Sequence, residues 1–109
     1  MVDSVSNNMP DPNNKAEYKH EFRESVTLFK EALNKYHTSN EIAQKKALQD
    51  VMNKALDTMG ESASGLMNKH LQELKAGLSE DFDDYADNPS SEGYEKLQND
   101  LQNIQDNVR

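Results

Sequence analysis

The sequence is notable first for what it lacks. It contains no cysteine and no tryptophan, and only three prolines and four glycines among 109 residues. Without cysteine the chain has no disulfide, no thiolate metal ligand and no thiol nucleophile.

No apolar run approaches the roughly 18 residues that a membrane-spanning helix needs. The N-terminal residues also lack the basic start and apolar stretch of a secretory signal, so we expect a cytoplasmic protein, with secretion by a non-classical route left open.

Large aliphatic and aromatic core residues are also scarce. Leu, Ile, Val and Phe together make up 20 of the 109 residues, and the formal net charge is -8. A composition with so few core residues and this much charge borders on that of disordered chains. Composition therefore leaves folding undecided, and the spacing of the apolar residues has to decide it.

The charge that is present is unevenly placed. Residues 78–109 hold nine acidic and two basic side chains, whereas residues 38–77 hold five of each sign. Nucleic-acid affinity depends on neutralising phosphates with Lys and Arg, so an acidic chain is a poor match for nucleic acid or for an anionic membrane. We expect neither as a partner. No small-molecule substrate is evident.

The apolar residues recur at helical spacing through most of the chain. Residues 1–14 show no such period and predict a disordered leader, so we assign residues 15–109 to a single helical domain. A first helix is expected at about residues 13–37. One face of it carries residues that step by three and four: Tyr18, Phe22, Val26, Phe29, Leu33 and Tyr36.

The sequence from Thr38 to Glu41 has the spacing of a capping box and predicts the start of a second helix there. The apolar face of this helix carries Leu48, Met52, Ala55 and Met59, widened by Ile42, Val51 and Leu56. Gly60 suggests a helix end. The apolar spacing nevertheless continues through Ala63, Leu66, His70 and Leu74. Residues 41–76 therefore form either one helix or two helices separated at Gly60, and we favour the single helix.

A third element is expected after Gly77, with Ser79 as its N-cap. Asn88-Pro89 then predicts an interruption before a final helix. The apolar residues of this helix step by three and four in a narrow coiled-coil-like line, and we call them the final-helix seam: Tyr94, Leu97, Leu101, Ile104 and Val108. The fold class that follows is all-α, a small antiparallel bundle of three to four helices with coiled-coil-like seams.

Three short patterns resemble metal sites but are incomplete. His20 and Glu24 occupy the positions of the two histidines in a zinc-protease motif, so half of the ligand pair is missing. Glu17 and His20 have the Glu-x-x-His spacing of di-iron bundles, but no second copy follows. Residues 81–92 fit a calcium loop at three positions and fail at Tyr85 and Ala86, where an oxygen ligand and a Gly are needed. We therefore expect no metal and no cofactor.

Two further features have a functional and a structural interpretation. His70 lies on an apolar face, where a pH switch is conceivable and a partly buried, hydrogen-bonded histidine is the more common arrangement. Met52, Met59 and Met67 could line an adaptable groove, although methionines on a helix face usually belong to the core. The sequence shows no phosphate loop, nucleophile elbow or catalytic triad.

These observations favour a non-enzymatic helical interaction module. The narrow seams suggest apolar surface that one chain cannot cover, so we expect the final-helix seam to pack against a protein partner or a second copy of the chain. The acidic C-terminal third suits a basic partner surface. Two alternatives remain: a small protein of a bacterial specialised secretion system, either cargo or chaperone, and, far behind it, a metal-binding helical bundle.

Overall fold

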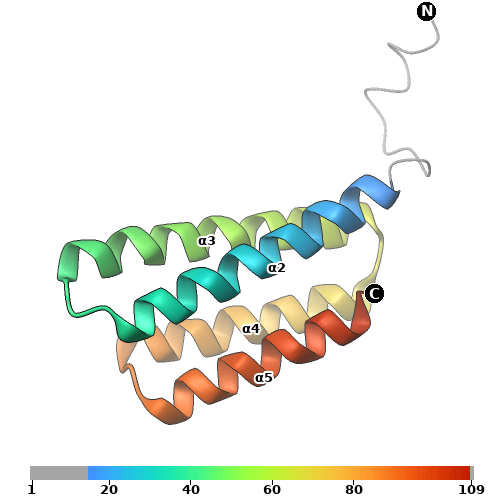
Figure 1. Ribbon diagram of the computed structural model, residues 1–109. Helices are drawn as coiled ribbons and strands as arrows, with labels where there is room; N and C mark the ends of the chain where they lie inside the picture. The colour runs from blue at the N-terminus through green and yellow to red at the C-terminus, as the bar shows by residue number, and fades with distance from the viewer. Residues whose placement is uncertain (1–14, 109) are drawn as a thin grey trace, which may run out of the picture.

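The computed structural model describes residues 15–108, and these form four α-helices (Figure 1). The helices are α2 (Lys15–Thr38), α3 (Ile42–Gly65), α4 (Lys69–Asp87) and α5 (Ser91–Asn107). The connections between them are of three residues each, which forces consecutive helices to run antiparallel. The predicted disordered leader at residues 1–14 lies outside the described residues.

Each helix packs against two others. α2 lies against α3, α3 against α4, α4 against α5, and α5 closes the ring by lying against α2. Figure 1 shows the result as an up-and-down bundle in which the start of α2 and the end of α5 lie at the same end. The prediction of an all-α antiparallel bundle is confirmed, with four helices in the part of the chain that the structure describes.

The core consists of the residues that the helical spacing pointed inward. From α2, five of the six predicted residues are buried: Phe22, Val26, Phe29, Leu33 and Tyr36. Phe29 meets Phe82 of α4 edge to face, with ring centroids 5.4 Å apart and planes at 76°, an arrangement that aromatic quadrupoles favour. Tyr18, at the end of the line, is only partly buried.

The face predicted for α3 is also largely correct. Met52, Ala55, Leu56 and Met59 are buried, and Leu48 and Val51 pack partly against the core. Ile42 is the exception, because it stands in the first turn of α3 and is 85% exposed.

The end of α3 differs from both predicted alternatives. The helix runs through Gly60 but stops after Gly65, so residues 41–76 form two helices that are separated at Leu66–Asn68. The Asn68 amide donates to the Ala63 carbonyl (3.2 Å) and the Met67 amide to the Ser64 carbonyl (3.0 Å). These are the two hydrogen bonds of a Schellman ending, and Met67 takes the left-handed conformation (φ 55°) that glycine usually supplies there. Asn68 then caps α4 by accepting from the Leu71 amide at 3.0 Å.

Two other predicted boundaries are wrong. Thr38 does not cap α3: its hydroxyl donates back to carbonyls of its own helix, and the N-cap position falls on Glu41, which makes no side-chain capping bond. Likewise α4 continues through Gly77 and Ser79 without a break. A mid-helix glycine costs only about 1 kcal/mol. The burial of Leu78 and Phe82, which lie on either side of Ser79, stabilises the continuous helix by more than that.

The boundary predicted at Asn88-Pro89 is confirmed. α4 ends at Asp87, and α5 follows with Ser90 as its N-cap, the Ser90 hydroxyl accepting from the Gly93 amide at 3.0 Å. None of the four helices in the described region is long and apolar enough to cross a membrane.

Candidate interaction surfaces

The final-helix seam lies inside the bundle. Leu97, Leu101, Ile104 and Val108 are at most 5% exposed, and Tyr94 packs partly against the same core. α5 contacts both α4 and α2 of the same chain, so these helices already cover the seam. The expectation that the seam is left uncovered by its own chain is therefore wrong, and any interaction surface has to be sought on the outside of the bundle.

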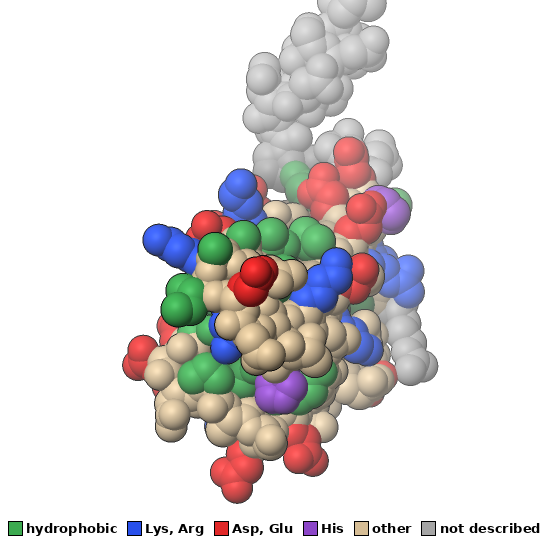
Figure 2. Space-filling model, turned by 60° about the vertical axis from the view of Figure 1, so that its left-hand side comes forward, with side chains coloured by type: hydrophobic (Ala, Val, Ile, Leu, Met, Phe, Trp, Pro, Cys, Tyr) green, Lys and Arg blue, Asp and Glu red, His purple; other side chains and the backbone are tan. Residues whose placement is uncertain are grey.

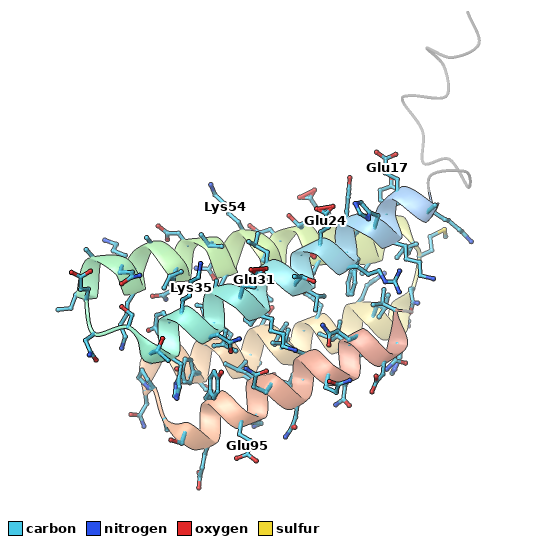
Figure 3. The ribbon with its side chains drawn as sticks, in the orientation of Figure 1. Glu17, Glu24, Glu31, Lys35, Lys54 and Glu95 are labelled. Atoms are coloured by element: carbon cyan, nitrogen blue, oxygen red, sulfur yellow. The ribbon has the colours of Figure 1, made fainter. Side chains whose placement is uncertain are left out.

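One outward-facing hollow lies between α2 and α3. It has a volume of about 590 Å³, and Leu28, 47% exposed, is its large apolar side chain. Glu24 and Glu31 line it from α2 and Lys54 lines it from α3; Figure 3 labels these three side chains. Arg23 adds a second cation to the lining. Because both signs of charge surround the hollow, its electrostatics do not select a partner of one charge.

The second candidate surface is the hairpin formed by α4 and α5. Residues 69–107 carry ten acidic and three basic side chains, whereas residues 15–65 carry eight of each sign. Because α4 and α5 pack side by side, tertiary structure places the acidic excess of residues 15–108 on one half of the bundle. Figure 3 shows Glu95 pointing away from α5 into solvent, and Figure 2 shows further acidic side chains along the lower edge of the molecule.

Eight of these ten acidic side chains are exposed: Glu73, Glu80, Asp83, Asp84, Asp87, Glu92, Glu95 and Asp106. The other two, Asp81 and Asp100, are partly buried between α4 and α5. These eight carboxylates share the hairpin surface with two exposed lysines, Lys69 and Lys96, so the surface is acidic in balance; we call the eight carboxylates the acidic hairpin face. Such a face attracts cationic partners and accelerates their association.

A polar and aromatic cluster joins α2 to this hairpin near the connection between α4 and α5. The His37 ring stacks on Tyr94 with centroids 3.9 Å apart, and His37 Nδ1 lies 2.6 Å from the Tyr85 hydroxyl. Burial, with the neighbouring tyrosines Tyr36 and Tyr94, raises the pKa of Tyr85 to about 12. The hydroxyl is therefore protonated at neutral pH and can donate to the imidazole. Asn34 on α2 accepts from both Tyr94 and Gln98 of α5.

Sequence reasoning missed this cluster for a physical reason. The contacts join residues 48 and more positions apart, and no local pattern marks His37 as the residue that α2 uses to reach α4 and α5. The cluster satisfies its own polar groups and fixes how α2 sits on the acidic hairpin. We assign it a structural role.

The incomplete metal motifs fall in ordinary helical settings. His20 pairs with Glu24 one turn away on the exposed face of α2. Asp81 and Asp83 lie within helix α4, so the first positions of the supposed calcium loop have helical geometry instead of a loop's. Among residues 15–108, no group of three His, Asp or Glu side chains is placed to hold a metal ion.

His70 and Met67 also differ from their sequence-based interpretations. His70 is exposed in the first turn of α4, so the prediction of a partly buried histidine is wrong. Met67 lies in the α3–α4 connection and is 85% exposed, whereas Met52 and Met59 are fully buried core residues. The three methionines therefore do not line a common groove.

The chain was also compared with known proteins. No protein-family model, no curated protein and no solved structure matches it.

Proposed function

We propose that this protein is a non-enzymatic interaction module whose acidic hairpin face binds a basic surface of another protein. The observation that carries this proposal is the segregation of charge, with ten acidic and three basic side chains in residues 69–107 against an even balance in residues 15–65. A folded chain that needed charge only for solubility would gain the same benefit from a dispersed arrangement.

The chemistry of this face favours a different protein over a second copy of the same chain. Two acidic hairpin faces brought together would repel each other, because like charges across an interface cost free energy. The final-helix seam, which we expected a helix-to-helix dimer to use, is inside the bundle, where Leu97, Leu101, Ile104 and Val108 are at most 5% exposed. A partner with clustered Lys or Arg side chains complements the face without any change in the bundle.

The test neutralises the face without altering the core. In one variant four exposed acidic residues of the hairpin become their amides: Glu80→Gln, Asp87→Asn, Glu92→Gln and Glu95→Gln. Affinity capture from cells of the source organism, followed by mass spectrometry and by titration of each identified partner, compares this variant with the wild type. We expect the partner to bind the wild type in a salt-dependent manner and the variant at least tenfold more weakly.

A matched control removes the same number of charges from the other half of the bundle. Its four substitutions are of exposed residues on α2: Glu17→Gln, Glu21→Gln, Glu24→Gln and Glu31→Gln. Circular dichroism establishes that both variants remain folded. The control should bind the partner as the wild type does. Equal loss of binding in both variants, or no loss in the hairpin variant, would refute the proposal.

A further inference from the structure

Two carboxyl groups meet between α4 and α5. Asp81 on α4 and Asp100 on α5 lie within hydrogen-bonding reach of each other, and the Asp81 side chain is only 17% exposed. Asp100 Oδ2 has almost no exposed surface, and no donor group of residues 15–108 reaches it, so no hydrogen bond stabilises a negative charge on this oxygen. Two carboxylates this close repel each other, whereas one proton shared between them turns the repulsion into a hydrogen bond.

The surroundings decide which carboxyl keeps its charge. Lys96 Nζ lies 3.3 Å from Asp81 Oδ1, so its positive charge stabilises the ionised form of Asp81. Asp84 on α4 helps to raise the pKa of Lys96 and so favours the charged lysine beside the pair. α2, the other helix packed against α5, supplies no charged group that shifts the pKa of Asp100.

We propose that Asp81 and Asp100 share one proton and thereby form a pH-responsive contact that holds α5 on α4. Asp100 carries the proton and donates it to Asp81, which stays ionised beside Lys96. Loss of that proton leaves two adjacent anions between the helices, so the contact changes from attractive to repulsive. The bundle therefore carries a titratable element in the same hairpin that bears the acidic face, although the proposal does not depend on any partner.

The direction of the pH dependence follows from the two carboxyl groups. Burial, and then the hydrogen bond and charge of Asp81, raise the pKa of Asp100 to about 7. The Asp100 proton thus stabilises the fold fully below about pH 4, which is near the pKa of an aspartate in the unfolded chain. This stabilisation is lost as pH rises through the pKa of Asp100 in the folded chain. The hydrogen bond from Asp100 lowers the pKa of Asp81. The ionised Asp81 therefore contributes to the stability of the fold at neutral pH, and this contribution is lost as pH falls through its lowered pKa.

The experiment compares urea unfolding of the wild type and Asp100→Asn between pH 5 and pH 8.5. An asparagine amide can donate permanently to Asp81, so it imitates the protonated acid. One proton changes the unfolding equilibrium constant by up to about tenfold per pH unit. We expect the wild type to lose stability relative to the variant as pH rises toward 7. At pH 8.5 the variant should be the more stable of the two. The three histidines are common to both proteins, so their titration cancels in the difference.

Asp83→Asn provides the control, since Asp83 is an exposed carboxylate on α4, the helix that carries Asp81. It should keep the wild-type pH dependence. A direct measurement on the unmodified protein is the titration of the aspartate side-chain carboxyl carbons by NMR, where one resonance, assigned to Asp100, should titrate close to neutrality. An Asp100 resonance titrating near pH 4, or an Asp100→Asn variant whose stability follows pH as the wild type's does, would overturn the proposal.

Discussion

Substitution of Leu101 tests whether the final-helix seam is the core of one chain or the interface of two. Leu101 is 1% exposed, so Leu101→Ala removes three carbon atoms from a buried site. At about 0.8 kcal/mol per methylene-sized group, the lost transfer free energy is roughly 2.4 kcal/mol. The cavity left behind adds to this, and the expected loss is about 2.5–4 kcal/mol of unfolding free energy.

The assay is urea unfolding at several protein concentrations. With an m-value of about 1.5 kcal/mol/M, the midpoint of Leu101→Ala should fall by roughly 2 M. In the fold described here, α4 and α2 of the same chain cover Leu101, so the wild-type and variant midpoints should not depend on protein concentration. A seam buried between two chains would instead give midpoints that rise with concentration.

Asn99→Ala is the control, because Asn99 is an exposed position on the same helix. Its stability should lie within about 0.5 kcal/mol of the wild type. The reasoning would be refuted by a Leu101→Ala variant that keeps its unfolding free energy but loses an oligomer in analytical ultracentrifugation.

Three further predictions follow from the helix packing and the helix ends. Gly77→Ala should raise the unfolding free energy by about 1 kcal/mol, because a Cβ there meets nothing within 4 Å; an unchanged or lower thermal midpoint would contradict this. Gly65→Ala should lower the thermal midpoint by several degrees, since its Cβ would lie 2.7 Å from the Tyr18 ring. If this clash is the cause, the double variant Gly65→Ala with Tyr18→Ala should lose less stability than the sum of the losses in the two single variants. Met67→Gly should raise the unfolding free energy, measured in urea, by about 0.5–1 kcal/mol, because glycine adopts the left-handed conformation (φ 55°) without the cost that methionine bears. A loss of stability would contradict this prediction.

Helical periodicity was sufficient to predict the fold class and most of the core. In α2 and α5 the steps of three and four residues put one face of each helix inward, and all of those residues except the partly buried Tyr18 and Tyr94 are buried in the structure. This works because the spacing of side chains around a helix is fixed locally, within two turns. The boundary at Asn88-Pro89 was predictable for the same reason, since proline restricts the residue before it.

Helix ends elsewhere were not predictable from single residues. Gly60 and Gly77 look like stops but lie inside helices, and the real break is at Met67, where no glycine stands. The cost of a mid-helix glycine, or of a left-handed methionine, is about 1–2 kcal/mol. Tertiary packing of α3 and α4 as antiparallel neighbours outweighs such costs, so the position of the turn depends on the whole bundle.

The sequence by itself determined that the chain forms amphipathic helices, which faces of α2 and α5 are apolar, and that the acidic excess lies in the C-terminal part. The tertiary structure decided what covers those faces: α2 and α4 pack on α5, which turned the expected interaction seam into core. It also brought Asp81 to Asp100 and His37 to Tyr85 and Tyr94. Periodicity specifies the direction in which a side chain points relative to its own helix, but which group lies opposite depends on how separate helices pack, and no local spacing encodes that.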